Sequence, residues 1–278
     1  MHLQPWLPAA LFALVAWSAQ RLLSKVALAG LGTRKFYLLS ALVSLLTYAP
    51  YLVFRPPAPH ELLPAFALAC LMAVTFGVTT EAIRRGPLGA VSPITALSPA
   101  LTAGLGIVFL HEKLAPWGYL GVVLAPAGIA LLSGGGRQAR LEDWFWLAVA
   151  SLALQGAGAF MAKLIVTPAG PSALLLMSAA VQVAVGLALA PPGSWSPTDL
   201  RGRAALYTIV GYAVAAVATI GYLLALASGP ASAVVPLVAA SPALAGLVGI
   251  AVLREKAGGR RLAGIAVALA GAVLLATG

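Results

Sequence analysis

Residues 86–113 of this 278-residue chain read GPLGAVSPITALSPALTAGLGIVFLHEK, and residues 229–256 read GPASAVVPLVAASPALAGLVGIAVLREK. The two segments align without a gap at a shift of 143 and are identical at 15 of 28 positions. Beyond them, Gly121 and Gly128 match Gly264 and Gly271 at the same shift. Near the start of each copy, position 6 matches position 144 at a shift of 138. The chain therefore contains two related halves.

The composition around these segments is that of a membrane protein. Hydrophobic residues make up 61% of the chain and charged residues 9%, whereas globular domains carry about 25% charged residues. A helix that spans a bilayer needs about 20 apolar residues. Ten such runs leave no room for a catalytic, nucleotide-binding or receptor domain outside the membrane. The sequence predicts an all-α polytopic membrane protein with ten transmembrane helices at 3–23, 36–54, 62–83, 88–110, 115–133, 144–165, 172–189, 204–227, 231–253 and 262–276.

Each half holds five of these spans, which is an odd number. The second copy must then enter the bilayer from the opposite side, so the two copies form inverted repeats. This architecture is typical of secondary transporters that work by alternating access. We expect a first five-helix unit at 1–133, a glycine-rich linker at 134–141 and a second unit at 142–278.

The chain resembles the EamA-type transporters of the drug/metabolite transporter (DMT) superfamily. The resemblance rests on the five-plus-five spans, on Trp17 and Lys25 in span 1, and on spans 4 and 9. Both of these spans contain a Pro-x5-Pro core and end in Leu-x-Glu-Lys. The resemblance implies a basket of ten helices whose central cavity is lined mainly by spans 1, 3, 4, 6, 8 and 9. It also implies transport of small metabolites such as amino acids, often outward.

Spans 4 and 9 each contain two prolines with serines nearby. A proline inside a helix removes a backbone hydrogen bond and kinks the chain. Within a bilayer, such backbone is tolerated where it faces protein or a water-filled cavity. We expect these kinks to line the cavity or to act as gates, with a static packing kink as the alternative. The residues are Pro93, Pro99, Pro236 and Pro242, with Ser98 and Ser241 as candidates for substrate binding.

Span 1 places polar side chains on one helical face, because Trp17, Arg21 and Lys25 are spaced by four residues. Gln20 is adjacent, and the matching span 6 carries Gln155 and Lys163. Cationic side chains within a span normally face the bundle interior or extend to the headgroups. We expect Arg21 to line the cavity and to favour a carboxylate or phosphate group. The two lysines lie near helix ends, so reaching the headgroups is their alternative role.

Glu81 in span 3 is the acidic residue that lies within a predicted span and could couple transport to protons. The alternative is an interfacial ion pair, because Arg84 and Arg85 follow at three and four residues. Further polar candidates within spans are Thr79, Gln182 and Tyr222. The tryptophans near span ends fit an aromatic belt at the membrane surface; these are Trp6, Trp117, Trp144, Trp146 and Trp195.

Motifs for other functions are missing from the sequence. There is no Gly-x4-Gly-Lys-Ser/Thr, no His-Glu-x-x-His and no Gly-x-Ser-x-Gly. The net charge of +10 does not indicate a nucleic-acid partner, because the basic residues mark the ends of apolar runs. We therefore expect no enzyme activity, no cofactor and no metal, and the lipid bilayer and a small solute as partners.

The basic residues also bear on orientation. Connections after the odd-numbered spans carry 13 Lys and Arg, whereas those after the even-numbered spans carry 3 when Lys163, near the end of the span at 144–165, is counted with them. By the positive-inside rule both termini would face outward, whereas the EamA resemblance implies termini in the cytoplasm. We follow the charge count.

These patterns together predict a secondary transporter in the plasma (inner) membrane that exports a small polar metabolite, such as an amino acid, by alternating access. One alternative is a flippase for a phosphate-bearing lipid or lipid-linked sugar, or a carrier of a phosphorylated or anionic metabolite. A channel-like or structural membrane protein without turnover is the other.

Overall fold

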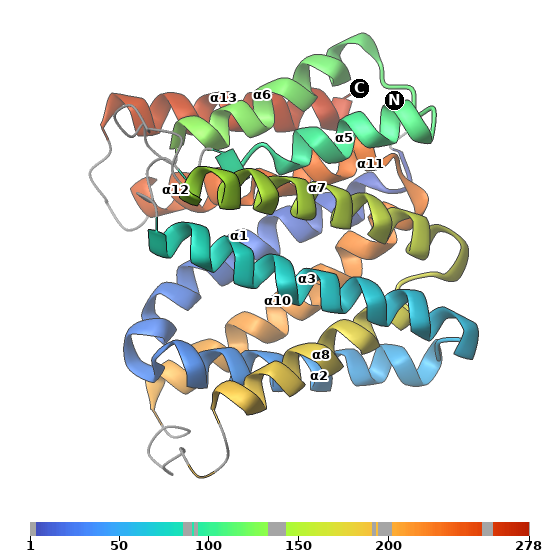
Figure 1. The fold of residues 1–278 in the computed structure, drawn as a ribbon. Coiled ribbons are helices and arrows are strands. Elements are labelled where there is room, and N and C mark those ends of the chain that lie inside the picture. The colour runs from blue at the N-terminus through green and yellow to red at the C-terminus, as the bar shows by residue number, and fades with distance from the viewer. Residues whose placement is uncertain are drawn as a thin grey trace.

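The computed structural model describes residues 4–85, 91, 94–132, 143–190, 193, 202–251 and 258–277, and the regular structure in these residues is helical (Figure 1). The helices are α1 (Leu7–Leu31), α2 (Thr33–Phe54), α3 (Pro59–Arg85), α5 (Ser98–Phe109), α6 (Pro116–Leu132), α7 (Asp143–Ala169), α8 (Ser172–Leu189), α10 (Arg203–Ser228), α11 (Ala231–Ala239), α12 (Ser241–Ala251) and α13 (Gly259–Thr277).

The lengths and composition of these helices are those of a polytopic membrane protein. Within the described residues, eight helical segments are long and apolar enough to cross a bilayer, with α11 and α12 together forming one of them. The apolar helices α5 and α6 are shorter and stand where spans 4 and 5 are predicted. The all-α, multi-pass class predicted from composition is therefore confirmed.

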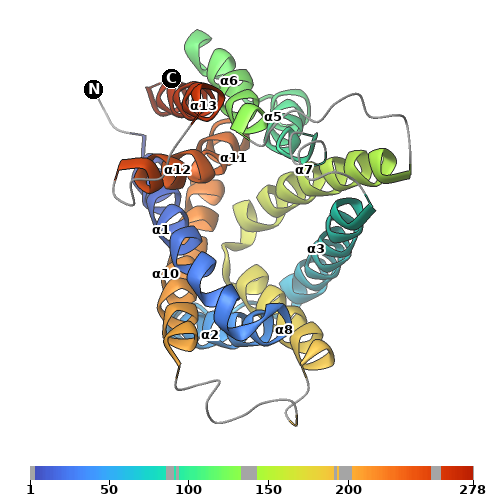
Figure 2. The same cartoon turned by 90° about the vertical axis from the view of Figure 1, so that its left-hand side faces the viewer.

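The helices surround a central space (Figure 2). Helices α1 and α10 pack together as one wall, and α3 and α7 as the facing wall. Helices α2 and α8 close one end of this ring, and α5 and α11 lie at the other end. The pair α6 and α13 packs outside α5 and α11. This arrangement leaves the polar faces of the walls directed at the interior.

Each proline-rich span is interrupted by a short turn whose last residue keeps right-handed helical backbone angles. In the first half, Leu97 precedes α5 and its carbonyl accepts hydrogen bonds from the N–H groups of Ala100 and Leu101 at 3.0 and 3.3 Å. In the second half, Ala240 follows α11, and its carbonyl accepts hydrogen bonds from the N–H groups of Ala243 and Leu244 at 2.9 and 3.2 Å. The two breaks lie 143 residues apart.

Two of the four prolines predicted to form kinks lie directly after these interruptions, at the start of the next helix. Pro99 and Pro242 each occupy the first turn of a new helix, where a missing N–H removes no helical hydrogen bond. A gating role for these two prolines stays a prediction. Pro236 lies inside α11, and Pro93 lies outside the described residues, as does the predicted linker at 134–141.

Small residues allow α6 and α13 to pack with their backbones close together. A Cβ on Gly128 would collide with the backbone of Ala268, and a Cβ on Gly271 would collide with the backbone of Ala125. These two contacts are related by the same 143-residue shift. Close approach through small residues is a common way for helices to associate in lipid, where dispersion contacts replace the hydrophobic effect.

The turns after α1 and α7 also match. Gly32 has φ of 71° and Gly170 has φ of 77°, a left-handed conformation that glycine adopts without steric cost. They lie 138 residues apart, which is the shift that relates spans 1 and 6. Each glycine reverses the chain between the first and second helix of its half.

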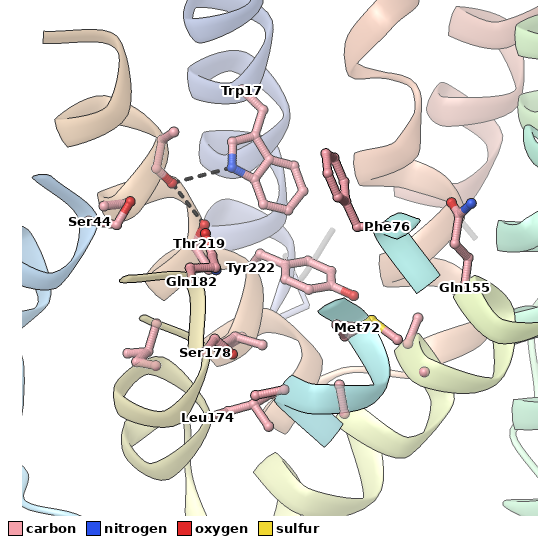
Figure 3. Close-up of a pocket in the computed structure, with 18 of the residues that line it drawn as sticks. Trp17, Ser44, Met72, Phe76, Gln155, Leu174, Ser178, Gln182, Thr219 and Tyr222 are labelled. Carbon is pink, nitrogen blue, oxygen red and sulfur yellow. Dashed lines mark hydrogen bonds between the residues drawn. The ribbon is translucent and has the colours of Figure 1, made fainter. Parts of the chain in front are cut away.

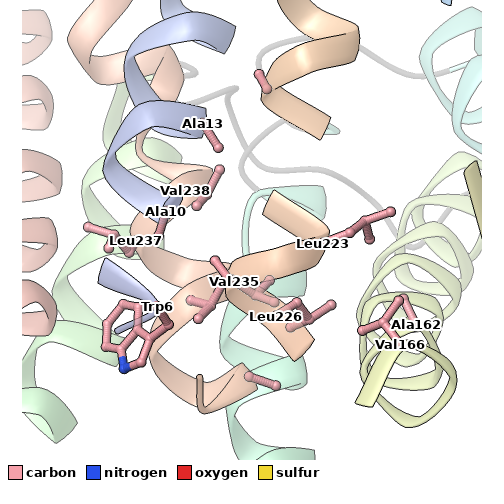
Figure 4. Close-up of a cluster of buried hydrophobic side chains, with 14 of the residues drawn as sticks. Trp6, Ala10, Ala13, Ala162, Val166, Leu223, Leu226, Val235, Leu237 and Val238 are labelled. Carbon is pink, nitrogen blue, oxygen red and sulfur yellow. The ribbon is translucent and has the colours of Figure 1, made fainter. Parts of the chain in front are cut away.

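The largest buried cluster lies towards the N-terminus of α1 and the junction of α10 with α11 (Figure 4). Trp6 is buried, and its indole lies against Gly229, where any side chain would collide with it. Leu226, Val235 and Leu237 belong to the same cluster. Trp6 and Trp144 are buried at 5% and 4% exposure, so the aromatic-belt interpretation is wrong for these two tryptophans.

Candidate functional site

A cavity of about 1070 Å³ lies between the two walls (Figure 3). Its lining comes from α1, α2, α3 and α5 of the first half and from α7, α8, α10 and α11 of the second. The polar and aromatic residues that line it are Trp17, Gln20, Arg21, Ser24, Phe36, Tyr37, Ser44, Tyr48, Phe76, Ser98, Thr102, Gln155, Ser178, Gln182, Tyr212, Thr219 and Tyr222.

Arg21 is the charged residue in the described lining. Its Nε donates a long hydrogen bond of 3.4 Å to Oγ of Ser241, at the start of α12. The side chain is exposed and lines the cavity, where a guanidinium with its five N–H donors can bind a solute. A cation with these donors and no facing carboxylate in the described lining suits an anionic group on the solute.

Trp17 and Tyr222 form an aromatic pair one turn of α1 away from Arg21. Their ring centroids are 5.3 Å apart with planes tilted by 44°. The indole Nε1 donates to the carbonyl of Ala215 at 3.3 Å, which holds the ring against α10. Figure 3 shows both rings in the cavity, and Met72 and Phe76 of α3 line the same cavity. This pair offers a rigid aromatic surface at mid-cavity.

Gln155 of α7 lines the cavity on the wall formed by α3 and α7. Its Nε2 donates to Oγ of Ser151 at 2.8 Å and lies 3.4 Å from Oγ1 of Thr79. The hydroxyls of Thr79 and Ser151 are 2.6 Å apart. Because the amide N–H groups are used in this way, the amide oxygen remains as an acceptor for a solute. Thr79 thus supports Gln155 and does not itself line the cavity.

The start of α5 contributes Ser98, Pro99 and Thr102 to the lining. Thr102 is fully buried, and its Oγ1 lies 2.9 Å from the carbonyl of Gly156 and 3.2 Å from that of Ser98. The hydroxyl therefore ties α5 to α7 across the two halves. Ser241, the counterpart of Ser98, is buried behind Arg21, and its carbonyl accepts a 3.0 Å hydrogen bond from Oγ of Ser18.

Glu81 is not the buried carboxylate considered for proton coupling. It does not line the cavity, its side chain is 32% exposed, and it accepts hydrogen bonds from Nε of Arg84 at 2.7 Å and Nε of Arg85 at 2.6 Å. All three residues lie in the last two turns of α3. The geometry is the local ion pair that sequence spacing offers as the alternative, so the expectation of a buried Glu81 is wrong.

Lys163 is also outside the described lining. Its Nζ donates 2.8 Å hydrogen bonds to the carbonyls of Leu226 and Gly229, the end of α10. A cation there complements the helix dipole and occupies carbonyls that lack helical partners. Across the same junction, Glu112 accepts 2.8 Å hydrogen bonds from the N–H groups of Ala231 and Ser232, the first turn of α11. The side chain of Lys25, the counterpart of Lys163, lies outside the described residues.

Helices α2 and α8 contribute lining residues that the resemblance does not imply. Ser44 and Tyr48 come from α2, and Ser178 and Gln182 come from α8. Ser44 and Gln182 lie 138 residues apart, so they occupy matching positions. Polar residues at matching positions of these two spans are the signal in the sequence that could have identified this surface.

Among the described residues, no group of three or more His, Cys, Asp or Glu side chains is placed to hold a metal ion. The lining offers one guanidinium, amides, hydroxyls and aromatic rings. These groups bind and orient a solute through charge, hydrogen bonds and stacking.

Comparisons with known proteins bear on the fold and on the family. A protein of known crystal structure is similar with a TM-score of 0.75 and 16% identity, over 97% of this chain and 95% of that chain. No curated protein matches the sequence. Residues 4–134 match the EamA-like transporter family, which confirms the resemblance seen in the sequence. Residues 4–134 therefore belong to the EamA-like transporter family, and this match together with the apolar membrane-spanning helices supports an integral multi-pass membrane transporter of the DMT type.

Proposed function

We propose that this transporter moves a small organic solute by alternating access between two inverted five-helix halves, residues 1–133 and 142–278. The observation that carries the proposal is the position of the cavity, which takes four lining helices from each half. A site at the seam between repeats changes its accessibility when one half rocks against the other. The same movement inside one half would require repacking of its core.

The contacts between helices support the two-fold relationship of the halves. Helix α1 packs on α10 as α7 packs on α3, and α2 packs on α10 as α8 packs on α3. Helix α5 packs on α7 as α12 packs on α1. Each contact between two helices thus has a counterpart between the matching helices of the other half. With five predicted spans in each half, the relationship is an inversion, and ten spans result when α5 and α6 complete spans 4 and 5.

The two ends of the cavity differ, which supports a state open to one side. Ala162, Leu223 and Val235 belong both to the lining and to the buried cluster around Trp6, so this cluster closes one end. Towards the C-termini of α1 and α3, Arg21 is exposed and Phe76 is 55% exposed. The accessible end is the one with most of the basic connections. By the positive-inside rule it faces the cytoplasm, which suits loading of a solute for export across the plasma membrane.

Thiol labelling tests the mechanism without a known substrate. The chain has one cysteine, so Cys70→Ala provides a background for single reporters. Ser178→Cys reports on the cavity, Leu226→Cys on the closed end, and Met161→Cys, at an exposed apolar position on α7, is the control. An impermeant reagent is applied to right-side-out and to inverted vesicles.

Alternating access predicts that Ser178→Cys reacts mainly from the cytoplasmic side and Leu226→Cys only from the opposite side. A ligand found by thermal-shift screening should change the two reactivities in opposite directions. Equal reaction of Ser178→Cys from both sides at once would indicate a channel and contradict the proposal. Counterflow of labelled ligand in proteoliposomes then measures turnover directly.

A second candidate function keeps the cavity but changes the solute. Arg21 suits a phosphate as well as a carboxylate, since its planar donors fit both groups. A flippase for a phosphate-bearing lipid or lipid-linked sugar, or a carrier of a phosphorylated metabolite, would use the same residue. Lipid scrambling or flipping in vesicles that depends on Arg21 would favour this candidate, whereas counterflow of a soluble solute would favour the first.

A further inference from the structure

The cavity is long, and Arg21 is the charged residue in its described lining. On α10 its lining runs from Tyr212 to Leu223, and on α2 from Phe36 to Tyr48. With a rise of 1.5 Å per residue these stretches are roughly 16 and 18 Å long. The volume of about 1070 Å³ is at the upper end of the range of pockets that hold drug-sized ligands. A small polar metabolite would leave most of this space to water.

The charged residue and the buried leucines of the lining lie towards different ends of the cavity, and the hydroxyl and amide groups of Ser44, Ser178, Gln182 and Thr219 also line it. Arg21 lies at one end, near Tyr212 at the start of the α10 lining. Phe36 packs edge-on against Tyr212 at 5.3 Å, and Tyr37 lies 5.8 Å from Phe76. These rings line the same cavity as Arg21, and the described lining contains no carboxylate.

The opposite end is lined mainly by buried leucine side chains. Leu68, Leu174, Leu175 and Leu223 line the cavity there, and each is less than 7% exposed. Their burial means that water gains little access between them. Burying apolar surface against these side chains is favourable by the ordinary hydrophobic contribution, about 0.8 kcal/mol for each methylene. Between the two ends lies the aromatic pair of Trp17 and Tyr222.

We infer that the solute is an amphipathic organic monocarboxylate, with its carboxylate at Arg21 and an apolar body that passes Trp17 and Tyr222 to the leucine-lined end. This inference deepens the proposed function, because it takes the cavity to be the transport site. It departs from the small polar metabolite predicted from the sequence. The solute class follows from one cation, no carboxylate in the described lining, and a buried apolar end about 16 Å away.

A chain-length series tests the inference. Purified protein in nanodiscs is titrated with butanoate, hexanoate, octanoate and decanoate, and with the primary amide of each acid as the uncharged control. Binding is measured as the change in tryptophan fluorescence that is lost in Trp17→Phe. The amides correct for partition into the bilayer, since they carry the same apolar chain.

For the wild type we expect each added methylene to tighten binding roughly three- to fourfold until the chain fills the apolar end. Each acid should bind at least tenfold more tightly than its amide. In Arg21→Gln the acid and amide should bind equally, with the dependence on chain length unchanged. Leu223→Ala should move the plateau to longer chains. If affinity is independent of chain length, or if acid and amide bind alike in the wild type, the inference is overturned.

This experiment separates the inference from the proposed function. Binding in nanodiscs needs no transport, so the acids can bind as described while counterflow fails. That result would reject alternating access and leave the ligand class standing. Counterflow of an unrelated solute without binding of the acids would reject the ligand class and leave alternating access standing.

Discussion

The carboxylate of Glu112 lies across the N-terminus of α11 and accepts a 2.8 Å hydrogen bond from the backbone N–H of Ser232. Its second oxygen accepts from Ala231 at the same distance. Glu112 follows α5 in the first half, whereas α11 belongs to the second half. The contact therefore joins the two halves at the closed end of the cavity, beside the α10–α11 junction.

Replacing Glu112 should weaken this end of the molecule. In Glu112→Ala two N–H groups of α11 lose their acceptor, and an unsatisfied buried donor costs about 1–3 kcal/mol. Glu112→Gln keeps one oxygen and should lose less. We expect the thermal unfolding temperature in detergent to fall in the order wild type, Gln, Ala. The neighbouring Lys113 is exposed, so Lys113→Ala is the control and should melt like the wild type. Equal melting of all four proteins would contradict the capping role.

Gly106 makes room for this carboxylate. A Cβ at Gly106 would lie 2.5 Å from Oε2 of Glu112, whereas a Cβ at Gly104, two residues earlier in α5, would meet nothing within 4 Å. We expect Gly106→Ala to displace Glu112 and to destabilise the protein about as much as Glu112→Ala. Gly104→Ala should be neutral or slightly stabilising, since alanine favours helix by up to about 1 kcal/mol. Unfolding of the matched pair in detergent measures the difference, and similar loss in both variants would argue against it.

Lys163 secures the other side of the same junction. Lys163→Met removes the donor to the carbonyls of Leu226 and Gly229 while keeping an unbranched side chain. We expect the closed end to loosen, so the reporter Leu226→Cys, as probed above, should react faster with the thiol reagent. Because Lys163 and Glu112 hold one junction, their effects should not add in the double variant. Additive effects on labelling rate would show that the two residues act independently.

Glu81 should have no part in energy coupling. Its carboxylate is taken up by Arg84 and Arg85 at the exposed end of α3. We expect Glu81→Gln to leave the pH dependence of counterflow unchanged. Arg85→Gln, which removes one partner of the same pair, is the matched control and should behave likewise. A pH dependence that disappears in Glu81→Gln alone would restore the carboxylate as a proton site.

The sequence predicts the helical class and the repeat well, because both depend on apolar length and on identities at a fixed shift. It locates the interruptions through Pro99 and Pro242 but does not give their detailed form. A proline is compatible with a kink or with the start of a new helix, and tertiary contacts decide between them. Here the breaks lie beside Ser98 and Ser241, where α5 and α12 pack against the opposite halves.

In the candidate site, too, the sequence predicts some features and tertiary contacts decide others. Gln155 and Lys163 lie eight residues apart on one face of α7, so spacing alone directs both to the cavity. Only Gln155 lines it, because Lys163 lies two turns further on, where the free carbonyls at the end of α10 take up its ammonium group. Helical periodicity gives the face of a helix but not the partner at each depth. Ser44 was missed, and Gln182 was only a weak candidate, because polar residues in largely apolar spans resemble ordinary interhelical contacts.

The seam between α6 and α13 has a consequence for how such a chain changes over time. Gly128 contacts Ala268 and Gly271 contacts Ala125, so the same glycine–alanine contact occurs twice in this interface. If the ancestral unit were a separate polypeptide, one substitution would alter both contacts of its homodimer at once. In the fused chain the same two contacts mutate independently. Each is then free to drift or improve by itself, and asymmetry between the halves can accumulate one residue at a time.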